Sequence, residues 1–596
     1  MGVVALRDEL YRIVEMIRTV QVREAHETML SLIETRSDSE ILIHRESIEL
    51  TISQFLPKRA EVLRQAFSQR VSCIQAAKPE QRDSDTIAGE EQLPEPPSRP
   101  KGGQTEHPPV RFADIKFGYI SAQYERRNMP KLLLDGFFER GGVVNELIDG
   151  SKFLVLGYKG GGKSSIAEHI DLAAQDNPEL FVENQLLRDF PYEQVPELVS
   201  GKEDISVRTN LAWSLLLLLK IFDSLTQDQS VSFDDGGARF DSLERDLRRL
   251  GLLPKLKFRD LVLVSREVNL SVELAKVVKG GLVGKYQEPT VVLSHVRDAL
   301  KKIICDARTP NRHLLIIDGL DEVFFLFNPW YSMVASLVHE IESLNADFDE
   351  SNSAAKVVLL CRTDIFERLP SPNINKLRDY SYVIDWYRDA GDPTNSDLFA
   401  LAQHRARTAG YVGKDVIRES IPEYLYMNTD PTNTYKFILD HTRHTPRDFL
   451  RLLSHIQRSL KDPSEVTFRD VIVGLRSYSI EYFLPELKDE LAGYFKPSEV
   501  AACFQIIGGL RQRNFSLDSL KQYATKAGLG SKIDLDAAVQ VLFDCSAVGN
   551  IVNRPHSDGV NDGVFYTFRY RNRNASVNYA ERLILHRGAW KALNLV

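Results

Sequence analysis

The sequence predicts an α/β protein built around a mainly parallel β-sheet, and two observations predict this fold class. Beyond residue 111, short apolar runs of strand length alternate with amphipathic stretches of helical period. Strands that helices cover on both faces are apolar along their whole length. The four runs with this property are residues 153–156, 314–317, 357–361 and 382–384. The second observation is a glycine-rich phosphate-binding motif that lies between the first run and a predicted helix.

Composition and charge narrow the class of protein further. The chain has 596 residues, of which 43% are hydrophobic and 27% are charged, and its formal net charge is −8. These values are typical of a globular protein with about three to five domains, and they give no overall basic field to hold nucleic acid. Five cysteines without CxxC spacing indicate reduced thiols. The apolar run at residues 211–219 is too short to span a membrane, so it predicts a buried helix in a cytoplasmic protein.

The N-terminal part of the chain has no catalytic constellation. Residues 1–77 predict a helical interaction module, because Leu6, Leu10 and Ile13 recur at three- and four-residue steps. Residues 78–110 are rich in proline, glycine and acidic residues and predict a flexible linker. We expect the module to contact an effector or companion protein.

The phosphate-binding motif begins the predicted nucleotide-binding domain, residues 111–395. Residues 157–164 read GYKGGGKS and match G-x-x-x-x-G-K-[ST] at every fixed position. Glycines let backbone N–H groups turn onto an anion, and the following helix adds its positive dipole end. The expected nucleotide-binding residues are Gly157, Lys159, Gly160, Gly161, Gly162, Lys163, Ser164 and Ser165. We expect Lys163 to contact the β- and γ-phosphates, and the Ser164 hydroxyl to coordinate Mg²⁺.

A second motif, HLLIIDGLDE, contains carboxylates that can act at the same phosphate-binding site. Its apolar strand ends in Asp318, where a carboxylate can hold Mg²⁺ beside Ser164. Asp321 and Glu322 follow on the loop, and either can orient or deprotonate an attacking water. The sequence leaves the choice between these two residues open. A simple acidic turn is the alternative, and the matched glycine motif upstream favours the catalytic interpretation.

Two arginines are candidates for contacting the γ-phosphate. Arg362 directly follows the strand at 357–361, and Arg447 follows Pro446, a residue that can open a helix. A guanidinium fork matches phosphate oxygens better than the point charge of a lysine does. The alternative for each arginine is an ordinary surface ion pair.

The remaining residues predict a helical lid at 396–485 and a winged-helix domain at 486–596. In the latter, three helices precede a hairpin formed by residues 548–553 and 564–570. Its wing carries the basic residues Arg554, Arg569, Arg571 and Arg573. The helix at 534–545 carries three aspartates and no lysine or arginine. Because readers of DNA present basic or amide side chains at this helix, a regulatory role is favoured over DNA binding.

Four segments together resemble the STAND-like and AAA-like branch of P-loop ATPases: GYKGGGKSS, HLLIIDGLDE, VVLLCRTD and HTPRDFLRLL. They are similar to its prokaryotic Sll-type group, many members of which belong to antiphage and conflict loci. The segments FGYISAQYERRNMPKLLLDGFFE and YRNRNASVNYAERLILHRGAWKAL resemble that group too, so the resemblance spans about residues 111–596. It implies an ASCE-type sheet of order 5-1-4-3-2, a helical lid and a C-terminal winged helix.

The resemblance also implies roles for individual residues. Lys163 and Ser164 would be the Walker A pair and Asp318 the Walker B ligand, with Arg362 as sensor on the fourth strand and Arg447 as the lid residue that contacts nucleotide. Gly319 departs from the AAA pattern, in which a catalytic glutamate directly follows the Walker B aspartate. The later carboxylates match the STAND form, for which slow turnover is as reasonable as fast cycling.

These observations give three expectations for function. The first is an ATP- and Mg²⁺-dependent switch that signals through homo-oligomerisation, acts in prokaryotic antiphage defence and uses residues 1–77 to bind its effector. The second is a DNA-engaged AAA-like loader or motor that uses the winged helix. The third is a nucleotide-binding scaffold without turnover. ATP is expected over GTP by resemblance, since the sequence has no guanine-reading NKxD segment.

Overall fold

The structure is a computed structural model of the whole chain. It describes residues 110–595 except 188–194, 196–203, 250–252, 254–288, 321–327, 371–373, 388–391, 428–429 and 554–563, together with Met29, Leu32, Ile33, Ile48, Leu63 and Phe67. The chain forms two compact units, Met1–Pro109 with Leu172–Pro178, and Val110–Asp171 with Glu179–Val596. The predicted helical module and linker lie outside the described residues, apart from those six positions and Val110. All that follows concerns the second unit.

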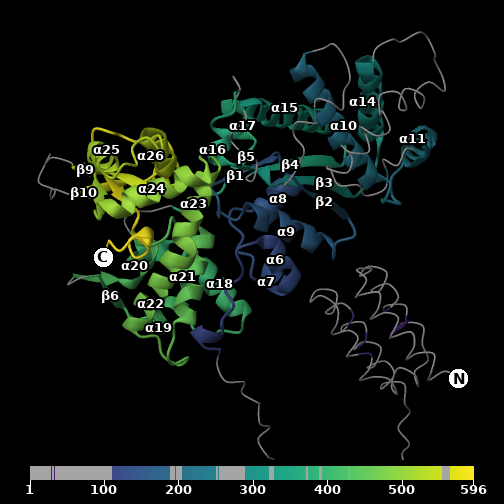
Figure 1. Cartoon of the computed structure of the whole chain (residues 1–596). Helices are drawn as coiled ribbons and strands as arrows, with labels where there is room; N and C mark the ends of the chain where they lie inside the picture. Colours follow the sequence, from purple (N-terminus) through teal and green to yellow (C-terminus); the bar gives the residue numbers. More distant parts are fainter. Residues whose placement is uncertain are drawn as a thin grey trace, which may run out of the picture. The chain divides into compact units, whose positions relative to one another are not determined.

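A five-stranded parallel sheet forms the centre of the nucleotide-binding domain (Figure 1). Its strands are β1 (Leu154–Gly157), β2 (Leu180–Leu186), β3 (Arg312–Asp318), β4 (Ala355–Arg362) and β5 (Ser381–Val383). They lie in the order β2-β3-β4-β1-β5, which confirms the predicted order. In this register Gly157 lies opposite Arg362, and Asp318 also ends its strand. The carboxyl ends of the strands therefore place all three residues at one edge of the sheet.

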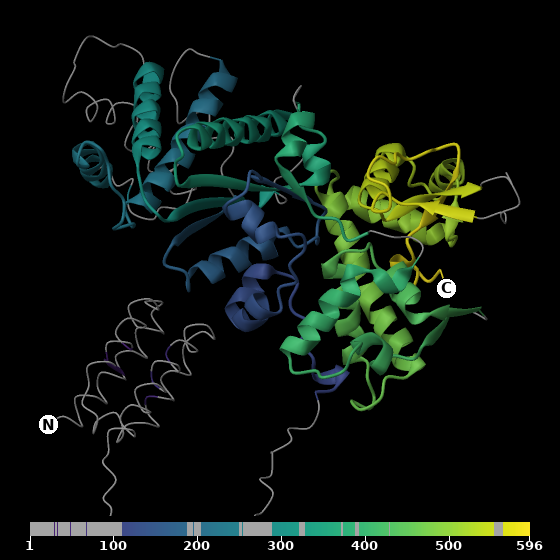
Figure 2. The same cartoon turned by 180° about the vertical axis from the view of Figure 1, so that it is seen from behind.

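Helices cover both faces of this sheet (Figures 1 and 2). One face packs on α8 (Val143–Ile148) and α9 (Lys163–Ala174), where Val155 meets Ile166 and Ile170. The other face packs on α10 (Ile205–Leu225), α14 (Pro289–Asp306) and α15 (Asn328–Glu350). Successive strand residues point to opposite faces, so Leu154 and Leu156 join this second core. Burial on both faces explains why β1, β3 and β4 are almost wholly apolar.

Helix α10 contains the apolar run that predicted a buried helix. It is long and apolar enough to cross a membrane by length and composition, with mean hydropathy 1.4, but 72% of that window is buried inside the protein. Its Trp213 Nε1 donates to the Met333 carbonyl at 3.2 Å. Lys220, almost fully buried on the same helix, pairs with Glu183 of β2 at 2.5 Å. Packing in the core thus accounts for the composition of this helix.

Strand β2 is not among the four predicted strands. Its sequence LFVENQL contains three consecutive polar residues, and it pairs only with β3 at the edge of the sheet. An edge strand tolerates polar side chains because solvent reaches it, and this removes the continuous apolar signal. The smaller elements of the domain are η1 (Phe112–Asp114), α6 (Ala122–Asn128), α7 (Pro130–Asp135), α11 (Ala238–Arg249), α16 (Thr363–Phe366), α17 (Ile374–Asp379) and η5 (Pro393–Asn395).

The lid region was expected to be wholly helical, and this expectation was wrong at one place. A two-stranded antiparallel sheet, β6 (Tyr424–Met427) with β7 (Asp430–Asn433), interrupts the helices. The short run YLYM is too brief to show a period in the sequence. The helical elements are α18 (Asp397–Thr408), α19 (Val416–Ser420), α20 (Thr434–Asp440), α21 (Pro446–Arg458), α22 (Phe468–Tyr478), the π-helical η6 (Ser479–Phe483) and α23 (Leu484–Ala492).

The C-terminal elements follow α23 without a break in the core. They are α24 (Pro497–Leu510), β8 (Asn514–Phe515), α25 (Leu517–Lys526), α26 (Leu535–Asp544), β9 (Val548–Asn553), β10 (Val564–Thr567), β11 (Arg582–Leu585) and η7 (Arg587–Ala589). The strands form an antiparallel sheet of order β10-β9-β11-β8. One hydrophobic core contains Phe449 of the lid together with Phe483 and Leu585, so the lid and the C-terminal elements pack as one body. The winged-helix interpretation stays a prediction.

Candidate functional site

The phosphate-binding loop connects β1 to α9, as the motif predicts. Gly160 and Gly162 have φ of +77° and +101°, a region that other residues rarely adopt. A Cβ on Gly160 would lie 3.0 Å from the Arg447 Cβ, so this glycine also permits the close approach of the lid. The Arg447 backbone N–H donates to the Gly160 carbonyl at 3.3 Å, and Trp386 Nε1 donates to the Gly161 carbonyl at 2.8 Å. The loop is therefore held from two sides.

The predicted site residues come together around one cavity of about 1080 Å³ at the carboxyl ends of the strands. The lining includes Lys159, Gly160, Gly161, Gly162, Lys163, Ser164, Ser165, Asp318, Arg362 and Arg447. Gly157 ends β1 beneath the loop and does not line the cavity. Lys163 is buried, and its Nζ donates to the carbonyls of Gly157 and Tyr158 at 3.1 and 3.3 Å. Asp321 and Glu322 lie outside the described residues.

The cavity offers oxygen ligands to a magnesium ion. Ser164 at the start of α9 and Asp318 at the end of β3 both line it, and Asp318 Oδ1 accepts from the Gly319 N–H at 2.8 Å. The described residues contain no cluster of three or more histidine, cysteine or acidic side chains that would hold a metal alone. Mg²⁺ usually takes one or two protein oxygens and completes its shell with phosphates and water. The donor set of Ser164 and Asp318 fits this ion.

Apolar and aromatic side chains also line the cavity and were missed from the sequence. They are Tyr119, Ile120, Val143, Trp386, Leu401 and Leu450. Gly118 precedes this segment with φ of +110°, and a Cβ there would clash with Arg405 Nη1 at 2.1 Å. Below it, Arg405 pairs with Glu125 at 2.8 Å, and Glu125 accepts from the Tyr119 N–H at 2.9 Å. A cavity with apolar and charged parts suits a ligand that is flat at one end and anionic at the other.

Arg447 reaches the cavity because of how α21 begins. Pro446 occupies the first turn, and the Thr445 side chain caps the helix by accepting from the Asp448 N–H at 3.2 Å. Asp448 is fully buried and is held by Arg443 at 2.9 and 3.0 Å and by the Tyr482 hydroxyl at 2.7 Å. Burial alone would raise the pKa of Asp448, but the charge and hydrogen bonds of Arg443 lower it to about 2. This fixed pair anchors the helix end from which Arg447 projects.

Arg362 lies at the end of β4, with 7% of its surface exposed. It forms a two-pronged contact with Asp364, at 2.9 and 2.8 Å. A further bond of 2.9 Å joins it to Glu490. Burial opposes ionisation of Asp364, but the charge and hydrogen bonds of Arg362 hold its pKa below the ordinary value. The expected sensor arginine is therefore a shared partner of two carboxylates at the cavity.

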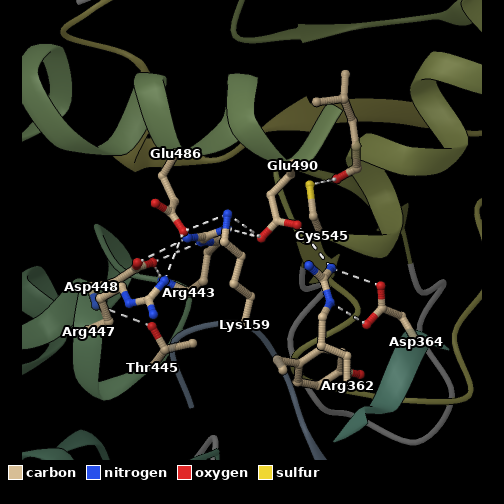
Figure 3. A network of polar contacts seen from close by, with 12 residues as sticks. Lys159, Arg362, Asp364, Arg443, Thr445, Arg447, Asp448, Glu486, Glu490 and Cys545 are labelled. Carbon is tan, nitrogen blue, oxygen red and sulfur yellow. Dashed lines mark hydrogen bonds and ion pairs between the residues drawn. The ribbon is translucent and has the colours of Figure 1, made fainter. Parts of the chain in front are cut away.

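Acidic residues of α23 enter the site, and the sequence analysis missed them. Glu486, Asp489 and Glu490 line the cavity, and Figure 3 shows the two glutamates among the basic side chains. Lys159 and Arg447 contact the same Glu486 oxygen, at 3.1 and 3.2 Å. Spacing of four residues places Glu486 and Glu490 on one helix face. That signal was present in the sequence, but the surface this face meets could not be inferred from it.

These features decide the fold of the domain. A parallel sheet of order β2-β3-β4-β1-β5, with a glycine loop between β1 and α9 and an aspartate ending β3, is characteristic of one class of enzyme. The domain has a P-loop ATPase fold.

Comparison with known proteins adds little to this assignment. No family model matches the sequence, and no curated protein matches it. Among solved structures, the chain is similar to Cdc6p from Pyrobaculum aerophilum, with 10% sequence identity and a TM-score of 0.27 over 80% of this chain and 95% of that chain. Superposition at this TM-score is poor, so the P-loop assignment rests on the sheet order and the loop.

The predicted basic wing lies against the ATPase domain. Arg569 pairs with Glu367 at 2.7 Å, and Arg573 pairs with Asp385 at 3.1 Å. Arg571 stacks over the Tyr387 and Tyr570 rings, at 5.9 and 5.6 Å from their centroids. Arg554 lies outside the described residues. Three of the four wing arginines are thus engaged in contacts within the chain.

The acidic helix of the C-terminal region is also partly engaged. Asp544 of α26 pairs with Arg368, which follows α16 of the ATPase domain, at 2.8 Å. Asp536 pairs with Lys521 of α25 at 2.6 Å, and Asp534 caps α26 by accepting from the Asp536 N–H. These aspartates therefore stabilise the C-terminal region and its contact with the ATPase domain.

Proposed function

We propose that this chain binds ATP with Mg²⁺ and hydrolyses it. The observation that supports the proposal is the single cavity at the carboxyl ends of the strands. It brings Lys163, Ser164, Asp318, Arg362 and Arg447 together from four separate segments of the chain. Positioning and charge stabilisation are the main contributions that proteins make to phosphoryl transfer, and this cavity gathers the groups for both.

Each group has a defined task in the proposed reaction, in which water attacks the γ-phosphorus and ADP leaves. The N–H groups of the glycine loop and the Lys163 ammonium bind the β- and γ-phosphates. Ser164 and Asp318 hold Mg²⁺, which neutralises charge on the phosphates when bound. The guanidinium groups of Arg362 and Arg447 stabilise charge that develops on the γ-phosphoryl oxygens. Asp321 or Glu322 orients the attacking water.

We further propose that this ATPase is a slow, nucleotide-dependent switch that signals by homo-oligomerisation. The lid and the C-terminal elements share one core, and this body supplies Arg447 and Glu486 to the cavity, so the nucleotide can change its position. The resemblance to the Sll-type group supports a role in prokaryotic antiphage defence, in the cytoplasm, with residues 1–77 binding an effector. The three described wing arginines, which motivated the DNA-engaged alternative, contact the ATPase domain, so we do not extend the proposal to DNA.

Phosphate release from ATP in the presence of Mg²⁺ tests the enzymatic part. We expect Lys163→Ala and Asp318→Ala to lower turnover by about a hundredfold or more, because each removes a group from the phosphate and metal shell. Lys532→Ala and Asp349→Ala, at exposed positions distant in sequence, are matched controls with unchanged turnover. Unchanged turnover in Lys163→Ala would contradict the site. Light scattering with and without ATP tests the switch, and an unchanged mass would contradict oligomerisation.

A further inference from the structure

Two glutamates of α23 form ion pairs with Arg362 and Arg447, which the proposed reaction assigns to phosphate, and with Lys159 of the glycine loop (Figure 3). Glu486 contacts Lys159 and Arg447 at 3.1 and 3.2 Å. Glu490 contacts Arg362 at 2.9 Å, and lies 3.9 Å from Lys159. These contacts join α23 to the glycine loop and to the end of β4, and also to the start of α21 within its own core.

Several cations surround the buried carboxylate of Glu490. Glu490 has 5% of its surface exposed, and Arg443 approaches it at 3.7 Å as a third cation. Burial alone would raise the pKa of Glu490, but Arg362, Lys159 and Arg443 together hold it below its ordinary value. A buried carboxylate is stable only where cations compensate it. The α23 carboxylates and the basic groups of the cavity therefore depend on each other.

Charge counting shows what a triphosphate would do to this network. The network contains four cations, Lys159, Arg362, Arg443 and Arg447, and four carboxylates, Asp364, Asp448, Glu486 and Glu490. Among these ion-paired side chains the two kinds of charge are equal in number, and Lys163 adds a further cation at the glycine loop. A triphosphate on the glycine loop brings several further negative charges to the same cations, and like charges close together are strongly disfavoured.

We propose that Glu486 and Glu490 compete with the nucleotide phosphates for Lys159, Arg362 and Arg447, so that binding of a triphosphate displaces α23. This inference rests on the proposed function, because it requires ATP at the glycine loop. Helix α23 continues directly from α22 and η6 and belongs to the core of the lid and the C-terminal elements. Helix α21, which carries Arg447, belongs to the same core and stays at the phosphate in the proposed reaction. We therefore expect α23 to shift away from Lys159 and Arg362 while α21 remains at the glycine loop.

Two ion pairs farther from α23 also hold the C-terminal elements to the ATPase domain. Arg368 with Asp544 and Arg569 with Glu367 connect the C-terminal elements to residues that follow α16. All four side chains are at least partly exposed, so these pairs contribute little each and can be exchanged for water. The pairs of α23 are the part of the contact that phosphate replaces, and the buried pair of Arg405 with Glu125 is left in place.

Nucleotide binding to the full chain tests the proposal. We expect the double variant Glu486→Gln, Glu490→Gln to bind ATP at least tenfold more tightly, because amides keep the shape but do not compete as anions. The affinity for adenosine, which lacks phosphates, should stay unchanged. Glu481→Gln is the matched control, since Glu481 is an exposed carboxylate on η6, the helical turn that precedes α23. The single variant Glu486→Gln, at a less buried position, gives a smaller gain in the same direction if the double variant folds poorly.

Hydrogen exchange provides a second readout that affinity alone does not give. ATP should increase amide exchange across residues 484–492 in the native chain, and Glu481→Gln should behave in the same way. Unchanged or weaker ATP binding in the glutamine variants, or unchanged exchange in α23, would overturn the competition. Failure of the native chain to bind ATP at all would instead overturn the proposed function.

Discussion

Two groups of arginines lie in different surroundings: the cavity arginines, which were candidates for contacting the γ-phosphate, and the wing arginines, which motivated the alternative of DNA binding. Arg362 and Arg447 line the cavity and pair with α23 carboxylates that line it too. Arg569 and Arg573 of the wing do not line the cavity, and they pair with Glu367 and with Asp385, of which only Asp385 lines it. Both groups form ion pairs within the chain, so pairing alone does not distinguish a ligand-binding arginine from a structural one. The difference is whether the arginine itself lines the cavity, where a ligand can reach it.

The largest effect is expected for the cavity arginine at the end of β4. Arg362→Ala should lower ATP turnover by about a hundredfold or more, because it removes charge that stabilises the transferring phosphoryl group. Arg362→Ala also leaves Glu490 and Asp364 without a compensating cation. Arg362→Lys is therefore the variant to compare with it, because lysine keeps the positive charge and lacks the guanidinium fork. Steady-state phosphate release measures both variants. Near-native turnover in Arg362→Lys would show that positive charge is sufficient and that the guanidinium fork is not required, whereas near-native turnover in Arg362→Ala would contradict a role in phosphoryl transfer.

A pH effect is expected where the wing packs against the lid. His444 stacks on Tyr570 with ring centroids 4.8 Å apart, and burial together with the charge of Arg571 lowers its pKa to about 3. The folded form therefore binds fewer protons than the unfolded form below pH 6.5, so stability falls as the pH falls from 6.5 toward 3. Between pH 7.5 and 5, one such histidine costs about 2 kcal/mol.

Thermal unfolding across this pH range measures the loss. His444→Asn should reduce the pH dependence, and asparagine tolerates the positive φ of 52° at this position. A slope that is identical in the variant would place the pH dependence elsewhere in the chain.

A smaller effect is expected for the lid arginine. Arg447→Ala should weaken ATP binding about tenfold, which corresponds to about 1.4 kcal/mol, because one charged contact to phosphate is lost. Its release of Glu486 offsets part of this loss. Titration with ATP and with adenosine separates a lost phosphate contact from a general change in the cavity, since the affinity for adenosine should not change. Equal losses for both ligands would assign Arg447 to general folding of the cavity.

The wing arginines should affect stability and leave nucleotide affinity unchanged. Arg569→Ala removes a partly exposed pair and should lower the free energy of unfolding by about 1 kcal/mol. DNA binding in a salt series provides the contrasting measurement. One result would contradict this assignment: DNA binding at 50 mM salt that weakens steeply by about 200 mM and is lost in Arg569→Ala. The wing arginines would then bind phosphate as well.

The smallest effect is expected at Arg451, one turn after Arg447 on α21. Its Nε is buried without a hydrogen-bond partner, and it lines the cavity. Burial and the charges of Arg458 and Arg447 lower its pKa, so an anionic ligand would relieve this repulsion. Arg451→Ala should weaken ATP binding a fewfold, whereas Arg458→Ala, at an exposed position, should not. Equal effects would assign both residues to the general charge of the lid.

The strands and the phosphate loop could be predicted because their signals are local. Burial on both faces makes β1, β3 and β4 continuously apolar, and the glycines of the loop are fixed by backbone conformation. The apolar pattern does not reveal a strand where burial is partial, as in the edge strand β2. It also does not reveal a very short element, such as the β6–β7 hairpin. The α23 carboxylates form a third kind of failure, because a helix face with two glutamates looks like an ordinary solvated surface.

The strand order was expected from the resemblance to P-loop ATPases, whereas the sequence by itself determined the apolar strands, the glycine loop and the identity of the side chains at the strand ends. Each of these depends on contacts or conformations within a few neighbouring residues, which leave a periodic or motif-like trace. Only the tertiary structure decided which charges meet. Lys159 and Glu486 are joined at 3.1 Å across more than half of the chain, and Arg569 contacts the ATPase domain instead of solvent. Which charged side chains form ion pairs depends on their distance in space, and the linear order of the residues does not specify that distance.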